Sequence, residues 1–344
     1  MNILITGIAG FVGSSLARTI LRDTPDVEIT GIDNLSFGYI QRLDDIQDQI
    51  EFIQADLSEI LTLLACRRFD TIIHCAAIAP LPECQIDAYR ALVQNVAICG
   101  AVADYALISG SRDIVFFSSG AIYEGVTQFP TPESVEISPT LNYPTSKYLA
   151  ELYFKALCRS QALNVTAIRL FNLYGPHQDY FRKQPPLIGY LLINLIQGTR
   201  ATLFSSGEQQ RDYVYIDDLI TLVRKAAKKM NSMQNGGNFC AVNAGSGIPV
   251  SVNKIITTLE NLAGKSLDIV RQPPEKYWDK YGELFERSIP INRTTIQQEV
   301  EKHTQASTSY VLQEFDWSAS VTMEQGLKAC LEYAATHKAI NQNV

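Results

Sequence analysis

The sequence has no pair of cysteines in a C-x-x-C arrangement, and its histidines are few and scattered. Its seven cysteines are an odd number and lie mostly in apolar segments, where cysteine behaves as a small hydrophobic residue. None of the four histidines has a second histidine at the helical spacing that metal ligands use. These absences argue against a disulfide framework, and we expect no metal site.

An excess of basic residues is also missing. The 344 residues include 29 Lys and Arg against 36 Asp and Glu, which gives a formal net charge of −7. A surface that binds a polyanion usually needs the opposite balance. We therefore expect no nucleic-acid partner, and the 46% of hydrophobic residues argues against disorder.

Long hydrophobic runs are scarce. The longest strongly apolar stretch, around Leu187 to Ile196, has about half of the roughly 20 residues that a membrane helix requires. The chain starts directly with the strand-like segment Asn2–Gly7, without the basic region, long apolar region and cleavage site of a signal peptide. We expect no membrane partner and a cytoplasmic protein.

Apolar runs of strand length alternate with helix-length segments in the first half of the chain. The runs are continuous in Val, Ile, Leu and Phe, which indicates strands that are buried on both faces of a parallel sheet. The pattern predicts an α/β fold with a Rossmann-type doubly wound parallel sheet. The strand-like runs are Asn2–Thr6, Val27–Ile32, Glu51–Ala55, Thr71–Cys75, Asp113–Ser118 and Val165–Leu170, and the helical segments are Val12–Arg22, Glu59–Ala65, Asp87–Ser109 and Thr145–Gln161.

This rhythm breaks after Leu170, where Gly, Pro and Tyr become frequent. We predict a Rossmann domain over residues 1–171, to which residues 212–245 return with a helix at Asp217–Lys229 and a strand at Asn238–Asn243. The remaining residues, 172–211 and 246–344, are expected to form a smaller C-terminal α/β lobe that binds substrate.

A glycine-rich turn follows the first predicted strand. Gly7 permits the tight turn, Gly10 lets backbone N–H groups approach a pyrophosphate at the positive end of the helix, and Gly13 allows close packing. Asp33 comes 20 residues after Gly13, just past the second strand, where a carboxylate can bind both ribose hydroxyls of an adenosine. Its charge repels a 2′-phosphate, and Asn34 rather than Arg follows it. The pattern predicts NAD, rather than NADP, as the cofactor.

Two further turns fall at the ends of predicted strands. Asp56 and Leu57 follow the third strand, where a side chain can reach the adenine edge. Small residues follow the fourth strand, namely Cys75, Ala76 and Ala77. This turn fits a cofactor contact and simple packing equally well.

Tyr143 and Lys147 stand four residues apart at a predicted helix start, hence on one face. A tyrosine that acts as a base near pH 7 needs its pKa lowered by about three units, and a lysine beside an oxidised nicotinamide supplies much of that. Ser119, at the end of a predicted parallel strand, is available to bind the reacting oxygen. Asn95 either joins a proton relay or is satisfied in the core, and both interpretations stay open.

The ordered set of motifs resembles the extended short-chain dehydrogenase/reductases, the NAD-dependent epimerase/dehydratase family that modifies nucleotide sugars. Within it, the sequence is most similar to UDP-galactose 4-epimerase-like enzymes, and the resemblance covers residues 1 to about 260. The motifs are T-G-x-x-G-x-x-G at 6–13, Asp33-Asn34-Leu35, Asp56-Leu57, His74-Cys75-Ala76-Ala77, Ser118-Ser119, Tyr143-x-x-x-Lys147, Arg169 to Pro176 and Arg211-Asp212-Tyr213-Val214.

The resemblance implies roles for individual residues. It implies that Ser119, Tyr143 and Lys147 are catalytic, with Asn95 as a further candidate. NAD is expected to contact the glycine turn and the residues Phe11, Val12, Asp33, Asn34, Asp56, Leu57, Asn95, Tyr143, Lys147 and Phe171. The nucleotide-diphosphate sugar is expected to contact Ser119, Tyr143, Asn172, Phe204, Arg211 and Arg287. Arg211 fits this role independently, because a guanidinium forms forked hydrogen bonds with phosphate.

Departures from the family pattern bear on the reaction. Dehydratases and decarboxylating relatives carry acidic or otherwise specialised residues directly after the catalytic Ser or Thr, whereas Gly120 and Ala121 have no proton to exchange. Hydride removal and return needs only Ser119, Tyr143, Lys147 and the nicotinamide. We therefore expect a nucleotide-sugar 4-epimerase. Glu124 stands where the family usually has Gly, and it is either solvated or in contact with substrate.

Three alternatives stay open at this stage: a nucleotide-sugar 4-ketoreductase or dehydrogenase, a C2 epimerase, and a non-catalytic sensor that binds NAD. In the resembled family, the helices that correspond to Asp87–Ser109 and Thr145–Gln161 pair across a two-fold axis. We accordingly expect a homodimer through a four-helix contact, unless both apolar faces are buried within one chain.

Overall fold

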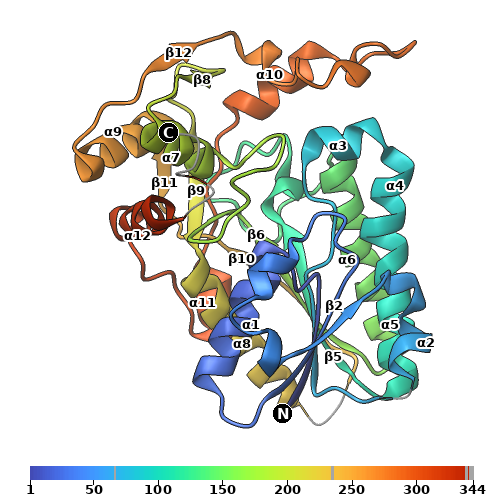
Figure 1. Cartoon of the computed structure of the whole chain (residues 1–344). Coiled ribbons are helices and arrows are strands. Elements are labelled where there is room, and N and C mark those ends of the chain that lie inside the picture. Colours follow the sequence, from blue (N-terminus) through green and yellow to red (C-terminus); the bar gives the residue numbers. More distant parts are fainter. Residues whose placement is uncertain (66, 234–235, 338–339, 341–344) are drawn as a thin grey trace.

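A seven-stranded parallel sheet forms the centre of the larger part of the protein (Figure 1). This computed structural model describes residues 1–65, 67–233, 236–337 and 340. The strand order is β10-β6-β5-β4-β1-β2-β3, and every neighbouring pair is parallel. The bounds are β1 Asn2–Thr6, β2 Glu28–Asp33, β3 Glu51–Gln54, β4 Thr71–His74, β5 Asp113–Ser119, β6 Asn164–Leu170 and β10 Phe239–Ala244. The predicted fold class and its six N-terminal strands are confirmed, with ends that shift by at most one residue.

Helices cover both faces of this sheet. One face packs against α1 (Phe11–Asp23), α8 (Ile216–Asn231) and α11 (Ser309–Phe315), which share a core with residues such as Phe117. The other face packs against α2 (Ile60–Leu64), α5 (Ile98–Ser109) and α6 (Asn142–Ser160), with Phe116 and Phe154 between the layers. The helix α11 lies within the segment that the sequence assigns to the second lobe, yet it packs on β10 and α8.

The second lobe contains two small sheets. One has the order β11-β9-β7 and the other pairs β12 with β8. Their strands are β7 Asn172–Tyr174, β8 Ala201–Leu203, β9 Gln210–Tyr215, β11 Pro249–Ser251 and β12 Ile269–Arg271. The helices are α7 Leu187–Gln197, α9 Val252–Ala263, α10 Arg293–Glu301 and α12 Met323–Thr336, and α12 packs on α7 and α9.

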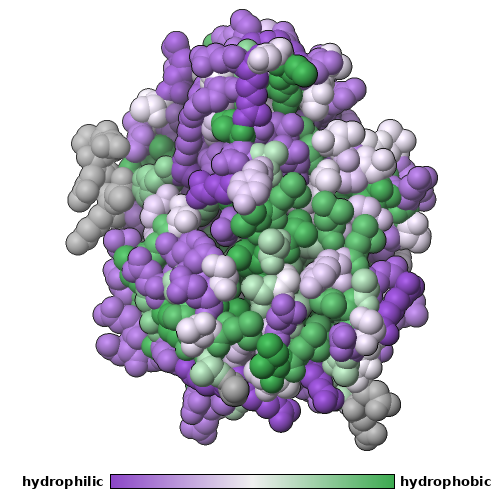
Figure 2. Space-filling model, turned by 90° about the vertical axis from the view of Figure 1, so that its right-hand side faces the viewer, coloured by the Kyte–Doolittle hydropathy of each residue, from purple (hydrophilic) through white to green (hydrophobic). Residues whose placement is uncertain are grey.

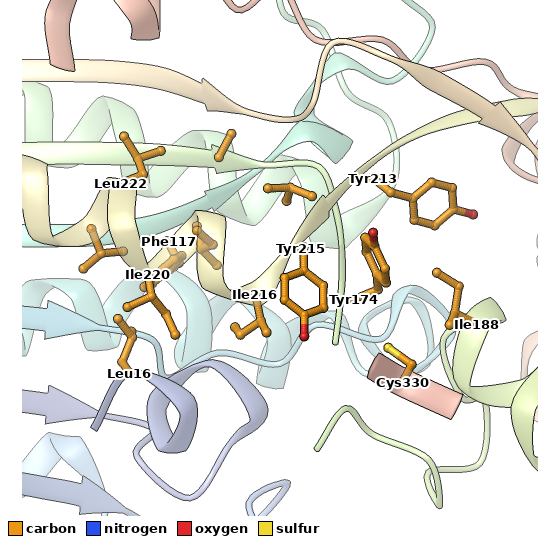
Figure 3. Packing of buried hydrophobic residues seen from close by; sticks show 14 of the residues in the cluster. Leu16, Phe117, Tyr174, Ile188, Tyr213, Tyr215, Ile216, Ile220, Leu222 and Cys330 are labelled. Carbon is orange, nitrogen blue, oxygen red and sulfur yellow. The ribbon is translucent and has the colours of Figure 1, made fainter. Parts of the chain in front are cut away.

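One hydrophobic core joins the large sheet to the second lobe. The ring of Tyr174 lies edge-on to those of Tyr213 and Tyr215, at centroid distances of 6.1 and 5.5 Å. Figure 3 shows this trio between Ile216 on α8 and Cys330 on α12. The three rings lie on β7, which directly follows β6, and on β9, which leads into α8, so their packing joins the lobe to the layer of the large sheet.

The expectation that Leu187–Ile196 is the longest apolar stretch is wrong. The helix from Ala88 to Ser109 is 22 residues long and apolar enough to cross a membrane by length and composition. A buried core helix passes the same test, and Ile98, Cys99 and Val102 of this helix pack beneath the sheet. The predicted segment Asp87–Ser109 is subdivided into α4 (Ala88–Leu92), a π-helical turn (Val93–Ala97) and α5.

Candidate active site

The glycine turn between β1 and α1 leaves no room for side chains. Gly7 has φ +68°, and a Cβ at this position would lie 2.8 Å from the backbone of Ala76. A Cβ at Gly13 would lie 2.4 Å from the carbonyl oxygen of Gly7. The helix α1 starts after Gly10 with no side-chain cap, so its first N–H groups face the turn without a side-chain acceptor. The turn therefore has the form of an anion-binding site.

Asp33 is the last residue of β2, and two backbone N–H groups fix its carboxylate. Its Oδ2 accepts from the N–H of Ala9 at 3.0 Å, and its Oδ1 accepts from the N–H of Leu35 at 2.8 Å. Burial raises the pKa of Asp33, while the two backbone hydrogen bonds and the charge of Arg42 act in the opposite direction. Each oxygen keeps a lone pair for a ribose hydroxyl.

Asn34 and Asp56 connect the ends of the next two strands. The Nδ2 of Asn34 donates to Oδ2 of Asp56 at 3.0 Å, and the other oxygen of Asp56 accepts from the N–H and hydroxyl of Ser58. Burial opposes ionisation of Asp56, but these hydrogen bonds outweigh it and lower its pKa. Leu57 follows with its side chain buried. The pair forms the edge of the groove beside Asp33.

The small residues after β4 have a packing reason. The N–H of Cys75 donates to the carbonyl oxygen of Thr6 at 3.1 Å, and Ala76 lies against Gly7. The backbone of Ala76 thus packs closely against Gly7. This geometry supports the packing interpretation for Ala76, and Cys75 and Ala77 are half-buried beside it.

Tyr143 and Lys147 lie in the first two turns of α6, and both are buried. The Nζ of Lys147 donates to the carbonyl oxygen of Phe117 at 2.8 Å, which fixes the lysine to β5. Burial lowers the pKa of Lys147. Burial also raises the pKa of Tyr143 to about 12, while a hydrogen bond with Ser119 and the charge of Arg182 act in the opposite direction. Ser119 thus lies within hydrogen-bond reach of the phenol, as the sequence predicts.

Asn95 lies in the π-helical turn and is 1% exposed. Its Oδ1 accepts from the N–H of Ile78 at 2.8 Å, and its Nδ2 donates to the carbonyl oxygen of Ile78 and to Oγ of Ser146, both at 3.0 Å. These contacts occupy its amide protons. Asn95 holds the segment after β4 against α6, which favours the interpretation of a satisfied core residue over that of a proton relay.

A cleft of about 1030 Å³ lies between the sheet ends and the second lobe. Its walls combine predicted residues from both parts of the chain: Phe11, Ser119, Tyr143, Phe171, Asn172, Phe204 and Arg211. The ring of Phe204 lies 5.4 Å from that of Tyr277, centroid to centroid. Phe11, the first residue of α1, shares this cleft with Tyr143.

Arg211 and Asn172 line the cleft, and their side chains also donate hydrogen bonds to backbone carbonyl oxygens. The guanidinium of Arg211 donates to the carbonyl oxygens of Glu299, Val300 and Lys302 at the end of α10. The amide of Asn172 donates to the carbonyl oxygen of Asp212 at 2.9 Å. Burial lowers the pKa of Arg211. The two side chains therefore anchor the cleft wall that they line.

Two predicted substrate residues lie elsewhere. Arg287 is not among the described residues that line the cleft, and its guanidinium donates to the carbonyl oxygens of Gln85 and Ile86 at the end of α3 (Leu81–Ile86). Glu124 is also outside the lining. Its carboxylate accepts from the N–H groups of Thr140 and Leu141, directly before α6. Glu124 is neither free in solvent nor in the cleft.

Sequence reasoning missed several cleft residues. Arg182, Lys183, Tyr277 and Lys280 line the cleft from segments without regular periodicity. The adjacent cations Arg182 and Lys183 were a usable signal in an acidic chain. Asp212 was also missed as a structural residue: it is fully buried and accepts from the N–H groups of Ser246, Gly247 and Ala306.

Comparisons with known proteins agree with this geometry. The sequence model of the family described as "NAD dependent epimerase/dehydratase family" matches residues 3–245. A UDP-glucose 4-epimerase of Mycolicibacterium smegmatis is 28% identical over 279 residues, which cover 80% of this chain and 86% of the relative. A dTDP-glucose 4,6-dehydratase of Mycobacterium tuberculosis is 27% identical over 231 residues, or 65% and 68% of the two chains.

Solved structures show the same fold. The UDP-glucose 4-epimerase of Thermotoga maritima, crystallised with UDP-glucose, superposes with a TM-score of 0.82 at 26% identity and covers 97% of this chain and 98% of that one. A UDP-N-acetylglucosamine 4-epimerase of Methanobrevibacter ruminantium superposes with a TM-score of 0.79 at 24% identity, with coverages of 96% and 97%.

Proposed function

The chain belongs to the NAD-dependent epimerase/dehydratase family, and we propose that it is a nucleotide-sugar epimerase that inverts C4 of the sugar. One observation carries this proposal. Ser119 and Tyr143 lie in one cleft with Asn172, Phe204 and Arg211, so the groups that exchange a proton and the groups suited to a nucleotide share one space. The similarity to the Thermotoga maritima enzyme with UDP-glucose supports the same substrate class.

NAD is the cofactor, and the residues fit it. The glycine turn has room for a pyrophosphate but not for side chains, and the carboxylate of Asp33 can bind ribose hydroxyls. Bound NAD would supply a hydride acceptor and, when oxidised, a positive charge. The ammonium of Lys147 donates to the carbonyl oxygen of Phe117, two residues before Ser119.

Tyr143 is the general base for the C4 hydroxyl. Its buried phenol is neutral without a ligand, because its pKa is raised to about 12. A base that works near pH 7 therefore needs cations around it, which Lys147 and an oxidised nicotinamide provide. Ser119 hydrogen-bonds the phenol and shares the proton of the sugar hydroxyl. After oxidation at C4, the same pair returns the proton.

The residues beside Ser119 favour epimerisation over loss of water. Gly120 and Ala121 line the cleft directly after Ser119 and carry no acid or base. A Cβ at Gly120 would lie 3.1 Å from the ring of Phe171, so an acidic side chain does not fit there without movement. Elimination of water needs such a group, whereas return of the hydride to the opposite face does not.

Retention of the cofactor separates this proposal from its rivals. A ketoreductase, a net dehydrogenase and a passive NAD sensor produce no isomer without added cofactor, and a C2 epimerase gives a different product. The test is to purify the protein in buffer without cofactor, add UDP-glucose, and identify the products by chromatography and NMR. UDP-galactose formed without added NAD supports the proposal, and a product inverted at C2 contradicts the assignment of C4.

We further propose a homodimer through α5 and α6. Figure 2 shows hydrophobic side chains gathered on the side of the molecule that α3 to α6 form. The exposed members there are Tyr89, Leu92, Ile108, Leu149, Leu152 and Tyr153. Exposed apolar patches of this kind mark interaction sites. The expected mass in solution is twice 38.3 kDa, and Leu152→Glu should convert the protein to a monomer.

A further inference from the structure

Three cations gather at one end of the cleft. Lys183 and Lys280 lie over the ring of Tyr281, with their Nζ atoms 4.2 and 5.8 Å from its centroid. The Nζ of Lys280 also donates to the carbonyl oxygen of Lys183 at 2.7 Å. Arg182 precedes Lys183, and all three side chains line the cleft that contains Tyr143.

Two carboxylates near these cations, Asp179 and Asp279, form ion pairs, whereas Glu83 and Glu283 act on Tyr281 through their charge and form no described ion pair. A carboxylate oxygen of Asp179 lies 2.5 Å from a guanidinium nitrogen of Arg42, whereas the ion pair of Asp179 with Arg182 is longer, at 3.7 Å. Asp279 pairs with Arg293 at 2.7 Å. Neither Lys183 nor Lys280 forms an ion pair with a described carboxylate, although the charge of Glu83 on α3 acts on Tyr281. The cluster is thus positive in a chain whose net charge is −7.

Like charges held together in a cleft repel one another. The charges of Lys183 and Arg182, together with burial, lower the pKa of Lys280. An anionic ligand relieves this repulsion and gains from three cations at once. Arg182 has donors to spare, because among its described contacts its Nε is committed to the carbonyl oxygen of Gln184 and only one terminal nitrogen is near Asp179.

Arg182 brings the cluster within reach of Tyr143, because its charge acts on the phenol and opposes the rise of its pKa. Leu81 packs both with the core that contains Tyr281 and with the core that contains Tyr143. Phe204 packs on Tyr277, which lies within range of the charges of both Arg182 and Arg211, and Arg211 is fixed to the end of α10. In a hexopyranose, C1 carries the diphosphate, and C4 lies across the ring. Groups beside Tyr143 therefore face the C4 to C6 end of the sugar, not the diphosphate.

We propose that Arg182, Lys183 and Lys280 form a subsite for a carboxylate on the sugar, so that the substrate is a nucleotide-linked hexuronic acid. This inference rests on the proposed function, because it places C4 of the sugar at Tyr143. The guanidinium of Arg182 suits a carboxylate through a forked pair of hydrogen bonds, and the two lysines act as point charges.

The test is equilibrium binding of UDP, UDP-glucose and UDP-glucuronate to the NAD-loaded protein. We expect UDP-glucuronate to bind at least about tenfold more tightly than UDP-glucose, as charge-assisted hydrogen bonds provide. Arg182→Gln and Lys280→Gln should each remove most of that preference and leave the affinity for UDP within about threefold. Arg182→Lys should restore part of it. The matched control is Lys328→Gln, an exposed lysine on α12, which should change nothing.

Two outcomes overturn the subsite. If the unmodified protein binds UDP-glucose and UDP-glucuronate with equal affinity, the cluster does not recognise a carboxylate. If the variants lose affinity for UDP as much as for UDP-glucuronate, the cluster binds the diphosphate instead. Failure of the proposed function looks different. If the protein prefers UDP-glucuronate but produces no isomer, the carboxylate subsite is supported and the epimerase activity is contradicted. If it interconverts UDP-glucose and UDP-galactose and binds UDP-glucuronate no more tightly, the epimerase activity is supported and the subsite is contradicted.

Discussion

Glu151 and Arg169 form a buried ion pair whose closest nitrogen and oxygen atoms are 2.8 Å apart. The pair joins α6, which carries Tyr143 and Lys147, to β6, which lies between β10 and β5 in the sheet. Ser118 donates to Glu151 from the residue next to Ser119, and Arg169 also donates to the hydroxyl of Tyr123. One polar network thus fixes α6, which carries Tyr143, to β5 and β6.

Glu151→Gln should destabilise the protein strongly, because it leaves the guanidinium of Arg169 buried without its countercharge. We expect the free energy of unfolding in urea to fall by about 3–5 kcal/mol. The control is Asp268→Asn, which breaks an exposed pair with Arg200 and should cost less than about 1 kcal/mol. A loss at Glu151 as small as the control would show that the network contributes little.

Stability in acid should depend on His74. This residue of β4 is fully buried between Thr6 and Cys99, and burial lowers its pKa from 6.5 to about 3, with the charge of Lys147 acting in the same direction. Between these two pH values the unfolded chain binds the proton and the folded chain does not. The free energy of unfolding therefore falls by about 1.4 kcal/mol for each pH unit below 6.5 on account of this group.

His74→Asn should flatten the stability curve between pH 6.5 and 4, measured by urea unfolding at each pH. Carboxylates contribute equally to both proteins, so the difference between the curves isolates the histidine. Parallel curves would mean that His74 titrates normally in the folded state.

Glu124→Ala should lower turnover without weakening ligand binding. The carboxylate fixes Thr140 and Leu141, which lead into Tyr143, and its hydroxyl contact with Thr140 is 2.5 Å. We expect kcat to fall about tenfold and KM to stay within about twofold, since an error in the position of a reacting group acts on the chemical step. Glu124→Gln keeps one accepting oxygen and should restore most of kcat. A change confined to KM would show instead that Glu124 contacts the substrate.

Arg211→Ala should weaken binding of UDP-sugars about 10- to 100-fold through lost charge-assisted hydrogen bonds, with NAD content unchanged. Arg271→Ala is the matched control, because Arg271 lies on β12 of the same lobe and is outside the cleft lining. Equal losses of NAD and sugar nucleotide would indicate that Arg211 serves only to hold α10.

The sheet was predictable because its signals are local. Each of the six N-terminal strands contains Ile, Val, Leu or Phe between its end residues, the glycine turn follows β1, and Asp33 ends β2 at a fixed spacing from that turn. Tyr143 and Lys147 were equally accessible, since helical geometry alone places residues four apart on one face.

The cleft wall was not predictable in the same way. Arg287 resembled a diphosphate ligand by its place in the chain, but the irregular segment before α10 turns its side chain to the end of α3. Arg182 and Lys280 are 98 residues apart and meet only through tertiary packing on Tyr281 and Lys183. Asn95 looked like a possible relay, and its contacts with Ile78 depend on a π-helical turn that periodicity does not reveal.

The most direct test of the account is to combine cofactor release with turnover in the unmodified protein and in Tyr143→Phe. We predict that denaturing the freshly purified protein releases close to one NAD per chain, and that the intact protein inverts C4 of a UDP-sugar without added cofactor. Tyr143→Phe should keep its NAD and lose at least about 100-fold in turnover. A protein that releases no NAD, or a Tyr143→Phe variant as active as the original, would contradict the account.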